Sequence, residues 1–203
     1  MEYDLSQLQT SDIYKLMTGS IIPRPIAWVS SQSEKGDLNL APFSYFNAVS
    51  ANPPILMISI GHKNATNLKD TLRNILETRE FVVNFVTRDN VEAMNATAIN
   101  APYGVDEFKL AGLTPVASQN VKVPRVKESP IHFECKLSDT HEFPENTVVF
   151  GEIIHIQMDD DICLDNYKID VDRYKPIARL AGTLYAELDE VFSLERPVYT
   201  KES

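Results

Sequence analysis

The sequence contains little glycine and almost no cysteine, and each shortage excludes a class of function. Seven glycines occur in 203 residues, and they form neither a G-x-G-x-x-G dinucleotide fingerprint nor a phosphate-binding P-loop. A G-x-S-x-G nucleophile elbow is also missing. Cys135 and Cys163 are too few for a disulfide framework in a chain of this length, which favours a reducing cytoplasm. The four histidines include no close pair at metal-ligand spacing, so we expect no metal site.

Long apolar runs and an excess of positive charge are absent as well. No apolar stretch approaches the roughly 20 residues of a membrane helix, and residues 1–19 have neither the basic start nor the apolar core of a secretion signal. The formal net charge is −10 at pH 7, which disfavours nucleic-acid binding. We therefore expect a cytoplasmic protein that binds neither nucleic acid nor membrane. The length predicts a single domain over residues 1–203.

Short apolar runs that are typical of strands dominate the chain. They cover Ile26–Ser31, Phe43–Val49, Ile55–Ile60 and Phe81–Val86. A longer segment, residues 131–143, alternates apolar and polar residues. Thr147–Met158 is a second long strand candidate, and the two predict a hairpin that turns at residues 144–146. On the first of these, Cys135 lies on the apolar face and is interpreted as a packing residue.

Helical periodicity is limited to two segments. In residues 64–80 an apolar stripe of Leu68, Leu72, Ile75 and Leu76 predicts a helix, with Asn67 as its N-cap and Asp70 in its first turn. A second helix is expected in residues 88–98, with Val91, Met94 and Ala98 facing inward. Residues 100–124 show no clear period and are expected to form a long connection over the main body. Strands thus outnumber helices without regular alternation, which predicts a closed or nearly closed antiparallel barrel with peripheral helices.

Residues 47–52, directly before Pro53 and Pro54, are the first candidate binding segment. The two prolines remove backbone donors and interrupt regular strand pairing, so the N–H groups before them are expected to be partly free. Free donors beside an aromatic-rich strand suit a flat heteroaromatic ligand with polar edges. The alternative is a tight, capped connection between two strands.

The expected helix start near Asn67 is the second candidate segment. A helix N-terminus offers unpaired N–H groups and a positive dipole end, and both attract phosphate. Thr66, Lys69, Thr71 and Arg73 add hydroxyl and cationic donors there. The alternative is a solvated, capped helix start. Taken together, the two segments suit a ligand with a ring at one end and a phosphate at the other, and flavin mononucleotide (FMN) has that shape.

The order of several motifs is similar to that of a known family. The stretches "TGSIIPRPIAWVSS", "NLAPFSYFNAVSANPPILMISIG", "KDTLRNI", "EFVVNFV", "GVDEFKLAGLTP", "PRVKESPIHFECKL", "VVFGEIIHIQMDDDI" and "YKPIARLAGTLYAEL" resemble the flavin reductase-like proteins, also called the flavoredoxin group. The resemblance extends from about Met17 to Leu188. It implies a mainly β, FMN-binding split β-barrel, antiparallel and Greek-key-like, which forms a homodimer with flavin near the subunit interface.

The resemblance also implies roles for individual residues. Asn47, Ala48, Val49 and Ser50 would hold the flavin ring and ribityl chain, largely through backbone groups, and Lys69, Asp70 and Thr71 would lie at the phosphate end. Asp70 is expected there as a cap rather than as a phosphate contact. Trp28 either walls the flavin or is a core tryptophan.

Three further side chains are candidates with open alternatives. His155 is expected on the strand face of Val149, Gly151 and Ile153, where it would assist proton transfer near flavin or nicotinamide or else be structural. Arg179 would meet an anionic group of the nicotinamide substrate or form an interfacial ion pair. Tyr185 would lie beside the flavin or in the dimer core.

The expected activity is an FMN-dependent NAD(P)H:flavin oxidoreductase, in which NADH or NADPH gives hydride to FMN. Because the cofactor supplies the redox chemistry, no acid–base dyad is required. One alternative is a flavoredoxin-type electron carrier that takes electrons from a redox protein partner, to which an acidic surface is suited. The other is a non-catalytic split-barrel protein that binds flavin. Steady-state oxidation of nicotinamide separates the first from the second, and failure to reduce bound flavin with any donor leaves the third.

Overall fold

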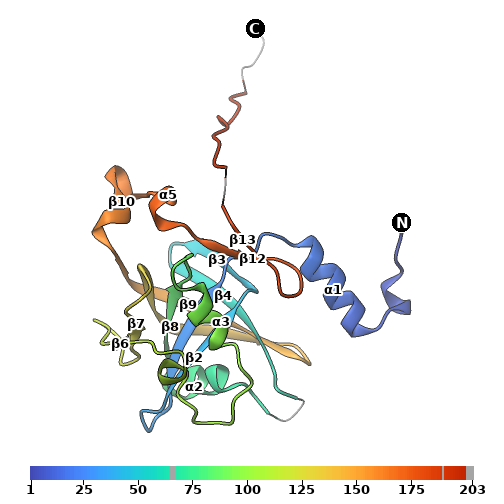
Figure 1. The fold of residues 1–203 in the computed structure, drawn as a ribbon. Coiled ribbons are helices and arrows are strands. Elements are labelled where there is room, and N and C mark those ends of the chain that lie inside the picture. Colours follow the sequence, from blue (N-terminus) through green and yellow to red (C-terminus); the bar gives the residue numbers. More distant parts are fainter. Residues whose placement is uncertain (65–66, 189, 200–203) are drawn as a thin grey trace.

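A computed structural model describes residues 1–64, 67–188 and 190–199. Its main feature is a seven-stranded antiparallel sheet, which forms the body of the molecule in Figure 1. The strand order is β2-β1-β5-β8-β9-β4-β3. The strands are β1 (Ala27–Gln32), β2 (Leu38–Phe43), β3 (Phe46–Ala51), β4 (Pro54–Gly61), β5 (Glu80–Phe85), β8 (Ile131–Glu142) and β9 (Asn146–Met158). The two outermost strands, β2 and β3, are consecutive in the chain, so the sheet curls until its edges nearly meet. The prediction of a mainly β antiparallel barrel is confirmed.

Short strand pairs and helices surround this barrel. The pairs are β6 (Pro115–Val116) with β7 (Arg125–Val126), β10 (Cys163–Leu164) with β11 (Lys168–Ile169), and β12 (Ile177–Arg179) with β13 (Tyr185–Glu187). The helices are α1 (Thr10–Ser20), α2 (Asp70–Thr78), α3 (Val91–Ala96), α4 (Glu107–Leu110) and α5 (Val171–Tyr174), with 3-10 turns at Leu5–Gln7, Asp160–Ile162 and Asp165–Tyr167. Helix α1 and residues 190–199 extend away from the barrel (Figure 1). Within the described ranges, no helix combines the length and the apolar character that a membrane span needs.

The interior of the barrel is filled by buried side chains from six strands, β1, β2, β4, β5, β8 and β9, and is covered by α2. Leu72 and Ile75 of α2 are fully buried against residues such as Phe81 and Val149. Cys135 belongs to the same cluster, and burial raises the pKa of its thiol, so the prediction of a packing role is confirmed. A second cluster outside the barrel contains Trp28, Leu40, Met94 and Phe108. Residues 100–124 lie over the main body as predicted, since Phe108, Leu113, Val121 and Val123 are all buried.

The helical stripes deviate from the predicted pattern. Leu72 and Ile75 face inward as predicted, but Leu76 is 39% exposed. The buried face of α2 instead includes Thr71 and Asn74. These polar residues lie on the same side of the helix as Leu72 and Ile75, and that side packs against the barrel. In the second predicted helix Met94 is buried, whereas Ala98 follows the end of α3 and is exposed.

The strand at residues 43–49 was predicted wrongly. Phe43 ends β2, and β3 begins only at Phe46, after the chain has turned from one edge of the sheet to the other. The corner is held by the Ser59 N–H, which donates to the Tyr45 carbonyl at 2.8 Å. The prolines do not end strand pairing either, because Pro54 pairs with Ala51 and β3 runs antiparallel to β4 with a shift between Ala48 and Ser50.

The packing at Gly151 gives a stability prediction. A Cβ atom at this position would lie 2.4 Å from Phe81 Cζ in the barrel interior, and overpacking of this kind costs about 1–3 kcal/mol. We expect Gly151→Ala to lower the free energy of unfolding by that amount in urea titrations. Gly61→Ala on β4 is the control, because its nearest neighbour would be 3.7 Å away. Equal stability of the two variants would contradict the described packing.

Candidate functional site

A groove lies where the end of β2 meets the start of α2. It consists of two adjoining hollows of about 740 Å³ and 510 Å³, which share Pro42, Phe43, His62, Lys63 and Lys69. The larger hollow continues toward Tyr45 and Asn146. The smaller continues toward Asn39, Asp70, Thr71 and Glu107. Both hollows therefore meet at two lysines and one phenylalanine.

The N-terminus of α2 opens onto the smaller hollow. The N-cap of α2 is Lys69, so the prediction that Asn67 is the N-cap is wrong. The Lys69 side chain makes no capping hydrogen bond. Asn67 instead pairs with Asn64 in the preceding loop, where the backbone has not yet entered the helix. The first intrahelical bond runs from the Arg73 N–H to the Lys69 carbonyl at 3.0 Å. The N–H groups of residues 70–72 precede it and have no intrahelical acceptor.

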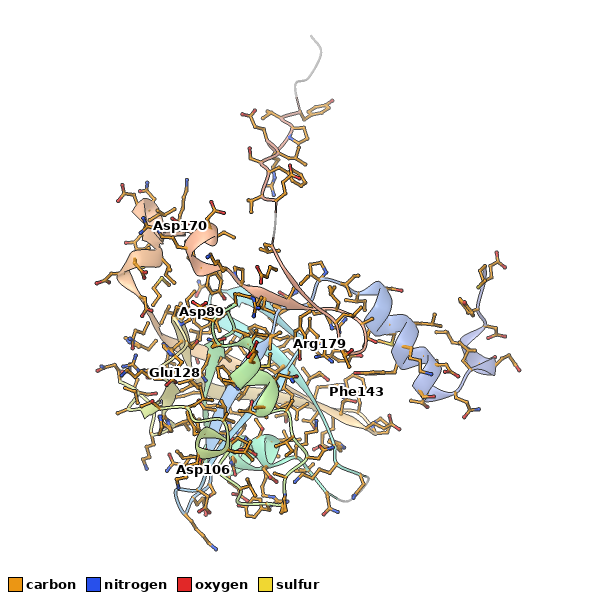
Figure 2. The ribbon with its side chains drawn as sticks, in the orientation of Figure 1. Asp89, Asp106, Glu128, Phe143, Asp170 and Arg179 are labelled. Atoms are coloured by element: carbon orange, nitrogen blue, oxygen red, sulfur yellow. The ribbon has the colours of Figure 1, made fainter. Side chains whose placement is uncertain are left out.

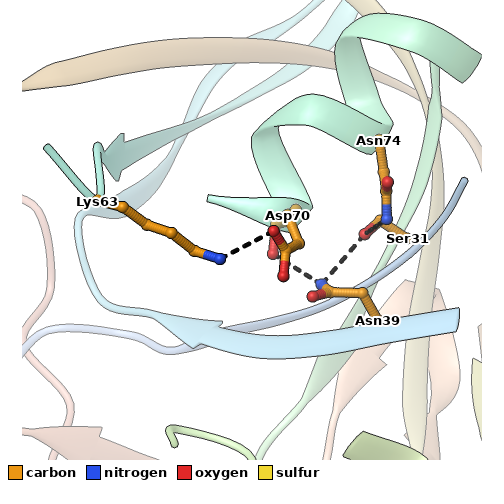
Figure 3. Close-up of polar contacts among 6 residues, drawn as sticks. Ser31, Asn39, Lys63, Asp70 and Asn74 are labelled. Atoms are coloured by element: carbon orange, nitrogen blue, oxygen red, sulfur yellow. Dashed lines mark hydrogen bonds and ion pairs between the residues drawn. The ribbon is translucent and has the colours of Figure 1, made fainter. Parts of the chain in front are cut away.

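The two lysines of the groove are in different electrostatic states. Lys63 Nζ lies 3.0 Å from Asp70 Oδ1 and forms an ion pair with it (Figure 3). Lys69 Nζ lies 5.6 Å from the centre of the Phe43 ring, and no carboxylate in the described part of the chain is within ion-pair distance of it. Burial lowers the pKa of the Lys69 ammonium, and the nearby charge of Lys63 lowers it further. An anion in the groove would oppose both effects by attracting the charged ammonium, so the arrangement is suited to binding one.

Glu107 supplies a buried carboxylate to the smaller hollow. Its Oε2 accepts a hydrogen bond from the Leu40 N–H at 3.0 Å. Burial raises the pKa of the Glu107 carboxyl, and the charges of Asp70 and Asp106 add to that rise, while the Leu40 hydrogen bond opposes it. The groove therefore contains acidic as well as basic groups. No group of three or more His, Cys, Asp or Glu residues suited to a metal ion occurs among the described residues.

The structure brings together the residues predicted for the phosphate end but not those predicted for the ring. Lys69, Asp70 and Thr71 all line the smaller hollow, whereas Arg73 stacks its guanidinium over the Tyr103 ring at 4.6 Å. Thr66 lies outside the described residues. The predicted ring-binding residues Asn47, Ala48, Val49 and Ser50 are on the exposed edge strand β3, where Val49 is 53% exposed. The groove is lined instead by the corner that precedes them, residues 42–45. The proline at position 42, directly before the strand predicted at residues 43–49, was a signal for this corner.

Trp28 occupies a core position. Its side chain has no exposed surface, and Nε1 donates to Thr97 Oγ1 at 2.9 Å. This geometry favours the packing alternative over a flavin wall, because a wall needs an accessible ring face.

The predicted orientation of His155 is wrong. Glu134 pairs with His155 while the adjacent Cys135 pairs with Ile153, so Ile154 is an extra residue in a β-bulge. The bulge reverses the alternation, and His155 lies on the side of Glu134, away from the barrel interior that Ile153 contacts. There it lines an open hollow with Arg125 and other polar residues, far along the strand from the groove.

Arg179 and Tyr185 line a third hollow that adjoins the groove. This hollow of about 300 Å³ also contains Pro42 and Phe43, and it is lined by Arg24 as well. Arg179 ends β12 (Figure 2), and its guanidinium lies 4.5 Å from the centre of the Tyr185 ring. Arg24 is buried and donates to the carbonyls of residues 18, 21 and 180. Arg179 donates to the Gly182 carbonyl, so of the two arginines in this hollow it has fewer hydrogen-bond partners among the described residues.

Comparison with known proteins identifies the family. The model described as "Flavin reductase like domain" matches residues 18–173. The chain belongs to this family. An uncharacterized protein of Aquifex aeolicus is 44% identical over 92% of this chain and 95% of its own length. The resemblance seen in the sequence motifs is confirmed.

Several solved structures share this fold over almost the whole chain. Nitrilotriacetate monooxygenase component B from Bacillus cereus is 40% identical, with a TM-score of 0.91 and coverage of 96% of this chain and 98% of that one. The Pseudomonas fluorescens 2-nitrobenzoate 2-nitroreductase NbaA is 32% identical, with a TM-score of 0.90 and coverage of 100% and 99%. Flavoredoxin of Desulfovibrio vulgaris shares the fold, with 23% identity and a TM-score of 0.77, and the match covers 95% of this chain and 96% of the flavoredoxin.

The buried carboxyl of Glu107 gives a prediction about pH. Its pKa in the folded protein is raised above that of the unfolded chain, so the stability it contributes is complete below the unfolded pKa and is lost as the pH rises through the folded pKa. Glutamine does not titrate but retains an acceptor for the Leu40 N–H. We expect the stability of Glu107→Gln relative to the wild type to increase between about pH 4 and pH 7. Urea unfolding at several pH values checks this, and a difference that does not change with pH would contradict it.

Proposed function

We propose that this protein is an FMN-dependent oxidoreductase that passes hydride from NADH or NADPH to flavin. The observation that carries the proposal is the pairing of Lys69, an ammonium without a carboxylate partner in the described residues, with the open N-terminus of α2 in one groove. Helix N-termini and lysines are recurrent ligands for phosphate. Lys69, Lys63 and Thr71 would hold the FMN phosphate, and Asp70 would hold Lys63 in place through its ion pair.

The ring and ribityl chain of FMN would lie along the corner at residues 42–45. This corner joins the phosphate hollow to the larger hollow and carries the aromatic side chains of Phe43 and Tyr45. Strand β3 continues directly from it, and one backbone edge of β3 faces away from β4 because β3 is the last strand of the sheet. Backbone groups of Asn47, Ala48, Val49 and Ser50 would contact the polar edge of the ring from there.

Bound FMN supplies hydride acceptance, so the chain itself has to bind, orient and shield the reactants. The hollow at Arg179 and Tyr185 adjoins the groove at Pro42 and Phe43. An anionic part of the nicotinamide substrate would bind Arg179, which would bring its nicotinamide ring toward the flavin. His155 is no part of this proposal, because it lies on the outer side of the sheet.

The similar proteins support an enzyme. Two of the most similar solved structures carry the names of a monooxygenase component and a nitroreductase.

The electron-carrier alternative is favoured by one observation, the net charge of −10, which suits docking to a basic redox protein. We also propose that the protein is a cytoplasmic homodimer. Exposed apolar side chains on α1 and β3, such as Tyr14, Met17 and Val49, offer a surface for a second copy.

The test is spectroscopic and kinetic. The protein is purified, desalted and scanned in the visible range, then titrated with FMN if it is colourless, and finally mixed with NADH or NADPH and excess FMN. A flavin spectrum or saturable FMN binding, followed by steady-state nicotinamide oxidation, is expected. Binding without nicotinamide oxidation, but with reduction by a protein donor, would support the electron carrier. No FMN binding at all would exclude all flavin-based functions.

The phosphate assignment leads to a prediction for Lys69. Because a charge-assisted hydrogen bond to phosphate is lost, Lys69→Ala should weaken FMN binding about 10- to 100-fold. Riboflavin has the same ring and ribityl chain but no phosphate, and its affinity should not change. Lys35→Ala, in the exposed turn between β1 and β2, is the matched control. Fluorescence titration measures the affinities of the wild type and both variants for FMN and riboflavin. An unchanged FMN affinity in Lys69→Ala would exclude Lys69 from the phosphate site.

A further inference from the structure

Four polar side chains are buried together beneath the groove, where α2 meets β1 and β2. They are Ser31 of β1, Asn39 of β2, and Thr71 and Asn74 of α2, and none is more than 7% exposed. Asn39 Nδ2 donates to Thr71 Oγ1 at 2.8 Å and to Ser31 Oγ at 3.2 Å. Asn74 Nδ2 also donates to Ser31 Oγ, at 3.1 Å (Figure 3). The network connects two strands of the barrel to the first turns of the helix.

The directions of these hydrogen bonds leave one proton uncommitted at the edge of the groove. An amide nitrogen carries two hydrogens, and Asn39 uses both on Ser31 and Thr71. Thr71 Oγ1 is therefore an acceptor in this pair and keeps its own hydroxyl proton. The described residues provide no second hydrogen-bond partner for that hydroxyl. Thr71 is 1% exposed and lines the smaller hollow, so this proton would serve an acceptor only if the acceptor reached the floor of that hollow.

We infer that Asn39 is a positioning residue that makes Thr71 a hydrogen-bond donor to the phosphate of the ligand. Asn39 acts through Thr71, since neither of its amide hydrogens is free to reach the ligand. The inference rests on the proposed function and deepens it, because it names the device that selects a phosphorylated flavin over an unphosphorylated one. The ligand class is a flavin that carries a phosphate monoester.

The charges of the hollow explain why such a device is needed. Lys63 and Lys69 face Asp70 and Glu107 across the same space, so the two positive charges are opposed by two carboxylates. Asp70 already neutralises Lys63 through their ion pair, so the charge attraction for a phosphate comes mainly from Lys69. Oriented donors add attraction that depends on geometry, and Thr71 supplies two of them, its hydroxyl and its N–H at the open helix start.

If the network had only a structural role, it would stabilise the fold less than an apolar contact. Asn74 Oδ1 is buried and has no hydrogen-bond partner among the described residues, which is unfavourable in a protein interior. An apolar contact between α2 and the strands would avoid that cost. The network is retained, on this account, because it orients Thr71.

The test compares affinities for FMN and riboflavin by flavin fluorescence, and the measured quantity is their ratio. Thr71→Val is nearly isosteric and removes the hydroxyl, and Asn39→Ala removes the group that orients it. Each should reduce the preference for FMN by about tenfold, and the double variant should lose no more than either single one. Thr71→Ser should retain the preference. Thr78→Val, at the other end of α2, is the control, because its hydroxyl bonds the Asn74 carbonyl instead.

The outcomes separate this inference from the proposed function. A wild-type ratio in Asn39→Ala, with a reduced ratio in Thr71→Val, would overturn the role of Asn39. A wild-type protein that binds FMN and riboflavin equally would overturn the phosphate subsite while leaving a flavin-binding protein. A wild-type protein that binds neither would overturn the proposed function itself and this inference with it. Circular dichroism verifies folding, and Asn39→Ser, whose shorter hydroxyl does not reach Thr71, replaces Asn39→Ala if the alanine variant does not fold.

Discussion

The contact between α2 and strands β1 and β2 is the constraint on which the rest of the site depends. One half of the buried face of α2 is apolar, and Leu72 and Ile75 pack into the barrel. The other half is polar, and Thr71 and Asn74 are hydrogen-bonded to β1 and β2 through Ser31 and Asn39. Apolar burial supplies most of the stabilisation, and the polar half fixes rotation and depth, since a shift of the helix would break these bonds. The open end of the helix, Lys69 and the Phe43 corner are thereby held around a single groove.

Much of the fold could be predicted because strand alternation and hairpin spacing are local signals. The β8–β9 hairpin follows from alternation and the short turn between its two segments, and the strands from Ile55 and Phe81 follow from short apolar runs. The corner at Ser44 and Tyr45 could not be predicted in the same way, since it depends on which edge of the sheet each half joins. The bulge at Ile154 is also a property of the pairing between two strands. A single sequence does not reveal that pairing, and the predicted face of His155 was wrong for this reason.

In the site, too, residues that are adjacent in the sequence were predicted, and residues that only the fold brings together were missed. Lys69, Asp70 and Thr71 were predicted together because they are consecutive at a helix start, and they do line one hollow. Asn39 and Glu107 were missed, because they reach that hollow from distant segments that only the folded barrel brings close. Asn47–Ser50 were predicted from backbone donors expected to be free before two prolines and from the family resemblance. The turn of the chain at residues 44–45 places them on an exposed edge. A chain with a net charge of −10 can still present a local anion site, because nearby groups outweigh distant, screened ones.

A crystal structure of the protein with FMN tests the central claim, that the groove between β2 and α2 holds the flavin by its phosphate. The account predicts density for the phosphate within hydrogen-bonding distance of Thr71 Oγ1 and Lys69 Nζ, with the ring extending along the corner at residues 42–45. Flavin bound elsewhere, or with its phosphate in solvent and its ring alone in the groove, would contradict it.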